Sequence, residues 1–189
     1  MKLLLTALLL LTSVVTQEPA KAQLDGNDSH YQLMEALEAR GINTYINAPP
    51  CYTTNAAGMY GHNRRIGPML IVCQDNKTQR RFVEVEWTPN DLDTLRHEAT
   101  HAIQDCLDGK QDGELASLYG PESLGAIGMD LEFVVDQLGY ERATSIVRLY
   151  QANGADDKTI ANELEAFYTA EHATAEEIEV LLNSSCPLK

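Results

Sequence analysis

The pattern of apolar and polar residues is strand-like over three short stretches in the first half of the chain. Strands are predicted at residues 42–46 and 69–74, the second a compact apolar run that fits a buried strand. Residues 81–87 alternate in a way typical of a half-buried strand at a sheet edge. Residues 53–67 are rich in glycine and asparagine, so a loop is predicted there.

A long helix is predicted from Pro89 to about Leu107, because both of its ends carry helix-boundary residues. Thr88 can accept backbone N–H bonds at the start, and Asp91 complements the helix dipole. Residues 108–109, Asp-Gly, end the helix. One broad face is apolar and predicts burial; it comprises Leu92, Leu95, Ala99, Ala102, Ile103 and Cys106.

The remaining pattern is helical. A short amphipathic helix is predicted at 31–40, before the first strand. Downstream, helices are predicted at 114–119, 121–127, 129–138, 140–152, 156–172 and 175–183. The pattern therefore indicates an α+β fold. In it, a small N-terminal, mostly antiparallel sheet precedes the long helix and a helical C-terminal half.

The first 22 residues have the pattern of a signal peptide. Lys2 precedes an apolar run from Leu3 to Leu11, and residues 20–22, Ala-Lys-Ala, fit a cleavage site. Because the run is short for a membrane span, we expect cleavage after Ala22 and no stable membrane insertion. A single domain is then expected over 23–189 in a secreted or periplasmic protein; an uncleaved N-terminal anchor is the alternative.

Four cysteines, Cys51, Cys73, Cys106 and Cys186, follow the predicted signal peptide. An even number in an exported chain indicates two disulfides. Of the three pairings, Cys51–Cys73 and Cys106–Cys186 are favoured. The first closes a loop between two predicted strands, and the second ties the C-terminal tail to the end of the long helix. A four-cysteine zinc site is disfavoured because no two cysteines are closely spaced.

The formal net charge of -14 narrows the choice of partners. Nucleic acids and anionic membranes need a basic face, so neither is expected as a partner. A strongly acidic surface fits an exported protein kept in solution by its charge.

The long helix carries the sequence His97-Glu98-Ala99-Thr100-His101, an H-E-x-x-H motif. Residues four apart lie on one face of a helix about one turn apart, so both imidazoles can reach one zinc ion. Glu98 is rotated about a hundred degrees from His97, which suits a general base that takes a proton from a metal-bound water.

A third protein ligand is required, and the predicted helix 156–172 offers two carboxylates, Glu163 and Glu165. They are two residues apart, so both cannot easily face one ion. His172, near the end of the same helix, is a further candidate, although a lone histidine there more often interacts with the helix dipole.

The motif and a downstream E-x-x-A over Glu163–Ala166 make residues 81–172 similar to the gluzincin metallopeptidases. The resemblance implies a zincin-like fold, zinc bound by His97, His101 and Glu163, and an edge strand, here 81–87, that pairs with an extended peptide. Family members often have Asp or Asn after this alanine, bonded to a ligand histidine; this chain has Phe167. The metzincin pattern fails, since Leu107 stands where its third histidine would be.

The sequence thus predicts an exported zinc metallopeptidase with Glu98 as general base and a peptide or protein as substrate. The alternatives are a non-catalytic exported metal-binding or interaction protein with a zincin-like fold, and a zinc hydrolase of other amides. Secondary candidates are His62, Arg64 and Arg65 for binding substrate carboxylates, and Tyr119, Tyr150 and Tyr168 as oxyanion donors.

Overall fold

The structure, a computed structural model, describes residues 27–78, 82–119, 131–186 and 188. The predicted signal peptide, 1–22, and the predicted helix 121–127 lie outside the described residues.

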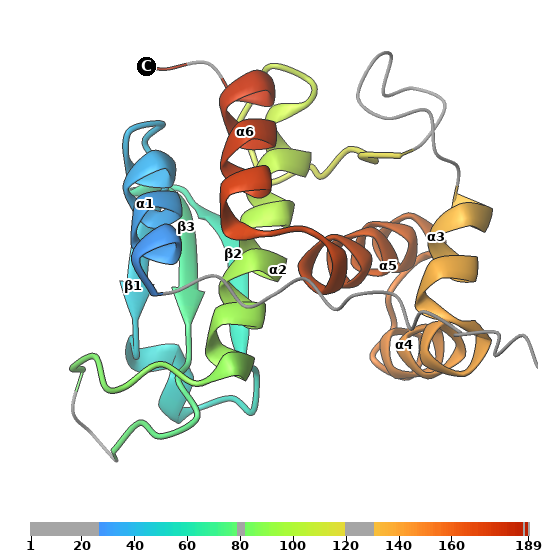
Figure 1. Cartoon of the computed structure of the whole chain (residues 1–189), viewed down its shortest axis with the longest axis horizontal. Helices are drawn as coiled ribbons and strands as arrows, with labels where there is room; N and C mark the ends of the chain where they lie inside the picture. Colours follow the sequence, from blue (N-terminus) through green and yellow to red (C-terminus); the bar gives the residue numbers. More distant parts are fainter. Residues whose placement is uncertain (1–26, 79–81, 120–130, 187, 189) are drawn as a thin grey trace, which may run out of the picture.

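The described part is an α+β fold in which three strands precede most of the helices (Figure 1). The strands are β1 (Asn43–Ile46), β2 (Gly58–Asn63) and β3 (Gly67–Val72), with a short 3-10 helix η1 (Pro49–Tyr52) after the first. The helices are α1 (Asn27–Glu38), α2 (Pro89–Cys106), α3 (Leu131–Leu138), α4 (Tyr140–Ala152), α5 (Asp157–His172) and α6 (Ala175–Ser185).

The sheet is mixed, with strand order β1-β3-β2, so the prediction of a mostly antiparallel sheet was wrong. β1 pairs in parallel with β3, and β2 pairs antiparallel with the other edge of β3. β2 lies inside the stretch 53–67 that was predicted to be a loop. Its glycines hid it from the pattern, since glycine is unfavourable in strands unless another group approaches closely. Gly58 is such a position, described below.

Residues 82–88 form no strand, which corrects the prediction for 81–87. Two buried side-chain amides hold this extended segment in place of a strand ladder. Asn47 Nδ2 donates to the Val83 carbonyl at 2.8 Å, and Gln74 exchanges two bonds with the backbone of Val85, at 2.9 and 2.8 Å. Side chains rather than a neighbouring strand therefore satisfy the backbone here.

Helix α2 forms the centre of the molecule, and its position decides where the site lies. The sheet, α1 and α6 pack on one side of it and α5 on the other (Figure 1). Fifteen of its eighteen residues are buried, including the whole predicted apolar face. Its start is the predicted one: Thr88 and Asp91 bond each other's backbone N–H groups in a capping box.

The C-terminal half is helical, as predicted, with one exception among the described residues. α4 matches the predicted 140–152, and α3, α5 and α6 begin or end within a few residues of their predicted limits. Residues 114–119, predicted to be helical, contain no helix. Instead, the Gln104 carbonyl of α2 accepts from the Ala116 N–H at 3.0 Å, and the buried side chains of Asn162 and Glu165 on α5 bond Leu115 and residues 117–119. These tertiary bonds replace the helical ones.

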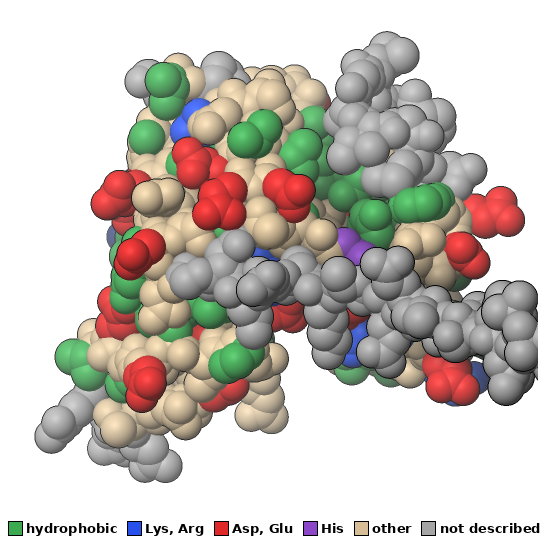
Figure 2. Space-filling view, in the orientation of Figure 1, with side chains coloured by type: hydrophobic (Ala, Val, Ile, Leu, Met, Phe, Trp, Pro, Cys, Tyr) green, Lys and Arg blue, Asp and Glu red, His purple; other side chains and the backbone are tan. Residues whose placement is uncertain are grey.

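Both favoured disulfides are present. Cys51–Cys73 joins η1 to the residue after β3, and Cys106–Cys186 joins the end of α2 to the end of α6. Such bonds are consistent with a protein that works outside the cytoplasm. None of the described helices is both long enough and apolar enough to cross a membrane. Acidic side chains are scattered over the face seen in Figure 2, in keeping with the net charge.

Candidate metal centre

The site lies where α5 packs against α2 (Figure 1). Hydrogen bonds fix the two helices at both ends of the contact. Gln104 Nε2 donates to the Asn162 carbonyl at 3.1 Å, and Arg96 Nε donates to the Ala170 carbonyl at 2.9 Å. Between these bonds, the middle of α2 faces the first half of α5, and this places Glu163 opposite the two histidines.

His97, His101 and Glu163 form one compact group whose candidate ligand atoms all lie within 4.8 Å of one another. The two Nε2 atoms are 3.2 Å apart. Glu163 Oε2 lies 3.2 Å from His97 Nε2, and its Oε1 lies 3.5 Å from His101 Nε2. All three side chains are largely buried, at 11%, 6% and 13% exposure respectively. The group could therefore hold a metal ion.

The charges of this group stabilise one another. Burial alone would raise the pKa of the Glu163 carboxyl, but hydrogen bonds from His101 and His97 hold that pKa well below its usual range. Burial alone would lower the pKa of His101, yet its hydrogen bond to Glu163 and the nearby negative charges outweigh burial and raise that pKa. Apart from the contact with His97, the buried Glu163 Oε2 has no partner among the described residues, so a cation would satisfy it.

Glu98 borders the group without belonging to it. Its carboxyl accepts a bond from the backbone N–H of Tyr60 on β2, and burial raises its pKa. Strand and helix are close here: a Cβ added to Gly58 would lie 2.7 Å from Glu98 Oε1 and 2.6 Å from Thr94 Cγ2. The glycine is therefore required for the contact that holds Glu98 in place.

The two histidines are oriented in different ways. His101 Nδ1 lies 2.7 Å from Gln104 Oε1, so a polar side chain fixes its ring. His97 packs against Phe167, with ring centroids 4.5 Å apart, and its Nδ1 is buried with no hydrogen-bond partner among the described residues. Phe167 thus occupies the place where the family resemblance predicted a polar partner.

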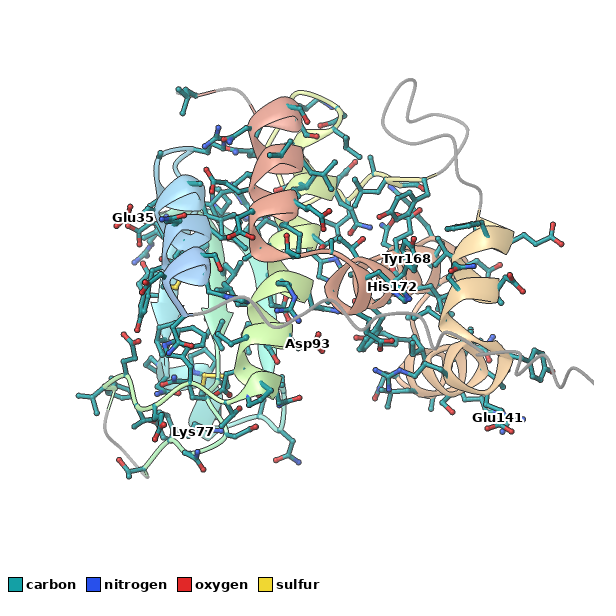
Figure 3. All side chains as sticks on the ribbon, in the orientation of Figure 1. Glu35, Lys77, Asp93, Glu141, Tyr168 and His172 are labelled. Carbon is teal, nitrogen blue, oxygen red and sulfur yellow. A yellow bond between two sulfur atoms is a disulfide. The ribbon has the colours of Figure 1, made fainter. Side chains whose placement is uncertain are left out.

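The alternatives for the third ligand lie elsewhere. Glu165 is not part of the cluster; it turns toward Gln104 and the backbone of residues 118–119. His172 stacks on Tyr168 and its Nδ1 lies 2.9 Å from the Tyr168 carbonyl, on the side of α5 near α3 (Figure 3). Of the three candidates, only Glu163 reaches the histidines.

The tyrosines proposed as oxyanion donors differ in their surroundings. The Tyr150 hydroxyl bonds Glu163, and burial together with this bond raises its pKa. The hydroxyl of Tyr119 bonds Thr169 instead, at 2.8 Å, and its pKa is raised to about 12, chiefly by burial. Tyr168 packs against Tyr119 and the stacked His172. Only Tyr150 is thus directed at the cluster.

The basic candidates do not reach the cluster. His62 lies near the end of β2, where its Cβ would be 3.1 Å from a Cβ added at Gly113. Arg64 and Arg65 are exposed in the turn between β2 and β3. That turn follows the end of β2 away from Gly58, so these arginines lie apart from Glu98.

Three residues of the site carried no signal recognised in the sequence: Gly58, Tyr60 and Gln104. Gln104 could have been found, since it lies three residues after His101 and therefore on the same helix face. Gly58 and Tyr60 lie about forty residues before the motif, and only the pairing of β2 with the sheet brings them to it.

The donor set fits a divalent transition-metal ion. Two imidazole nitrogens and one carboxylate oxygen are a common three-ligand set for catalytic zinc, with a fourth position left for water. Comparison of the chain with family models, curated proteins and solved structures gave no match. The case for a function therefore rests on the residues themselves.

Proposed function

We propose that this protein is an exported zinc-dependent hydrolase, and that its substrates are peptides or proteins. The observation that carries the proposal is the convergence of two helices: α2 supplies His97 and His101 and α5 supplies Glu163, with Glu98 beside them but outside the group. Three ligands and a separate buried carboxylate are what hydrolysis of an amide by an activated water requires.

A zinc ion held by the three ligands would supply a water of lowered pKa and polarise the substrate carbonyl. Glu98 would take a proton from the attacking water and pass it to the leaving amine, because burial raises its pKa and makes the carboxylate a stronger base. The Tyr60 amide would keep that carboxylate oriented. The Tyr150 hydroxyl, next to Glu163, would donate to the oxygen that becomes negative during attack.

The proposal of a peptide substrate is supported by β2, which replaces residues 81–87 as the edge strand next to the site. β2 lies at an edge of the sheet, and its Tyr60 amide bonds Glu98, so this strand runs past the proposed general base. An extended peptide could pair with such an edge and carry its carbonyl to the centre. The gluzincin resemblance also assigns peptide binding to an edge strand.

The direct test is Glu98→Gln in the zinc-loaded protein. We expect the variant to keep its zinc and to lose at least about a hundredfold of its cleavage of a fluorogenic peptide library. Glu35→Gln on α1 is the control, because that exposed carboxylate lies far from α5 (Figure 3). Full activity in a zinc-loaded Glu98→Gln protein would remove the mechanism.

Metal content separates the enzyme from the non-catalytic alternative. We expect about one zinc per chain in the purified protein and its loss in His97→Ala, because two ligands alone bind zinc weakly. Zinc well below one per chain and unchanged in His97→Ala would favour the exported interaction protein. A loaded protein that cleaves acylated amines but no peptide would favour a hydrolase of other amides.

A further inference from the structure

Gln104 connects the metal centre to a second buried carboxylate. Its side chain is fully buried. Its Oε1 lies 2.7 Å from His101 Nδ1, while its Nε2 donates to Glu165 Oε2 at 2.9 Å and to the Asn162 carbonyl at 3.1 Å. One amide therefore spans the distance between a candidate ligand and Glu165.

Glu165 in turn holds the segment after α2. Its side chain is 1% exposed. Besides Gln104, it accepts bonds from the Ser117 hydroxyl, the Leu118 N–H at 2.8 Å and the Tyr119 N–H at 3.3 Å. A carboxylate that accepts from four donors has its hydrogen-bonding capacity satisfied, which explains why Glu165 can be buried.

The chemistry of these groups sets the direction of every bond in the chain. A carboxylate with donors around it and a backbone carbonyl both accept only, so the amide nitrogen of Gln104 must face Glu165 and Asn162. Its oxygen must then face His101 Nδ1, which consequently carries the ring hydrogen. Once the imidazole is neutral, the lone pair is left on Nε2, the atom that faces His97 and Glu163.

We propose that Gln104 and Glu165 are positioning residues that hold His101 in the tautomer able to bind metal and tie the segment 117–119 to the metal centre. The proposal rests on the proposed metal site but concerns residues outside it. Neither side chain touches metal or substrate; each acts through His101.

Residues 112–113, which precede the segment 117–119, are bonded to α2 farther from the centre. Asp105 Oδ1 accepts from the N–H groups of Asp112 and Gly113, at 3.2 and 2.8 Å, and Asp105 Oδ2 accepts from the Tyr60 hydroxyl at 2.6 Å. Gly113 also lies against His62 of β2.

Metal binding should slow hydrogen exchange at the Leu118 and Tyr119 amides, because it fixes His101 and with it the bonds through Gln104.

The first experiment needs no metal. At alkaline pH, where both imidazoles are neutral, nitrogen NMR of the metal-free protein should show His101 with its hydrogen on Nδ1. Gln104→Met keeps the size of the side chain but removes the acceptor, so a mixture of tautomers is expected. Gln111→Met is the control, because Gln111 donates to the Arg40 carbonyl and Cys106 Sγ rather than to the site. An unchanged tautomer in Gln104→Met would overturn the proposal.

The second experiment measures zinc affinity by competition with a chelator, together with the absorption spectrum of the cobalt-substituted protein. Gln104→Met should weaken zinc binding by about 10–100-fold and shift the cobalt bands, whereas Gln111→Met should change neither. A merely structural role would lower the melting temperature without changing the cobalt spectrum. That outcome would also overturn the proposal.

A measurement on the wild-type protein guards against a variant that fails to fold. Unchanged hydrogen exchange at the Leu118 and Tyr119 amides on zinc loading would contradict the proposal, because Glu165 accepts from both amides. A wild-type protein that binds no zinc would instead refute the proposed function, and the tautomer would still test this inference.

Discussion

At the scale of single residues, the two histidines of the centre show that one motif can be supported in two ways. His101 has a polar partner on its own helix, whereas His97 has an aromatic ring and a buried Nδ1 with no partner among the described residues. Ligand histidines usually donate their second N–H group, and this bond strengthens metal binding. His97 is therefore the weaker-supported ligand.

Phe167→Asn should correct this weakness. The shorter amide can accept from His97 Nδ1, so we expect zinc affinity to rise by about tenfold. Loss of the ring should reduce stability by about 2–3 kcal/mol, since Phe167 is half-buried. Phe167→Ala, which loses the ring without gaining an acceptor, is the matched control for a chelator-competition measurement. Equal affinities in the two variants would show that the missing partner does not limit binding.

The raised pKa of His101 makes metal binding depend on pH. In the metal-free protein this imidazole stays protonated above the ordinary histidine range, and the protonated form pairs with Glu163. This pairing adds stability at low pH that is lost as pH rises through the raised pKa. Metal must displace the proton, so calorimetry near neutral pH in buffers of different ionisation enthalpy should show release of about one proton per ion. Zinc uptake without proton release would mean that His101 is already neutral.

At the scale of elements, the contact between β2 and α2 decides whether a bound metal would be catalytically useful. Their close approach places the Tyr60 amide on the Glu98 carboxylate, and Gly58 makes that approach possible. The ligands, in contrast, come from α2 and α5. Metal binding and proton transfer therefore depend on different pairs of elements and should be separable by substitution.

Gly58→Ala is the variant that separates them. The added methyl group would contact Glu98 and Thr94 at less than 3 Å, so the carboxylate must move. We expect zinc affinity within a few-fold of the wild type and a loss of about a hundredfold in peptide hydrolysis. Gly61→Ala on the same strand is the control, since a Cβ there meets nothing within 4 Å. If the two variants were equally active, β2 would not position the general base.

At the scale of the whole molecule, one disulfide fastens the C-terminal end of the structure to α2, and the other closes a loop at the sheet. Cys106–Cys186 spans 80 residues and closes the C-terminal helices onto α2, while Cys51–Cys73 spans 22 residues at the sheet. Arg40 strengthens the first closure, because its Nε donates to the Cys186 carbonyl at 3.0 Å. The helical half, which supplies Glu163, is thereby held against the helix that supplies the histidines.

Removing the Cys106–Cys186 disulfide should destabilise the protein more than removing Cys51–Cys73. Each disulfide restricts the unfolded chain, so its removal raises the entropy of that state. The free energy of unfolding should therefore fall by about 4.5 kcal/mol for Cys106→Ala/Cys186→Ala and by about 3.4 kcal/mol for Cys51→Ala/Cys73→Ala. Urea unfolding of both double variants measures the difference. A smaller loss for the 80-residue closure would indicate that the C-terminal helices stay docked in the unfolded ensemble.

The sequence by itself determined the features that depend on local spacing. The capping residues fixed the start of α2, the helical period fixed its buried face, and the four-residue spacing put His97 and His101 on one side. Two of its strands and most of the C-terminal helices followed from the same periodicities. The disulfide pairing was also predicted, because each favoured pair joined elements that the pattern had already defined.

Tertiary structure alone decided the rest, since those features arise from contacts between residues far apart in the chain. Gly58 of β2 is explained only by its contact with Glu98, and residues 82–88 are bonded by amides from Asn47 and Gln74. Residue type and position on the predicted helix do not by themselves choose between Glu163 and Glu165 as the ligand. The rotation of α5 against α2 turns one toward the histidines and the other toward Gln104, and no local pattern encodes that rotation.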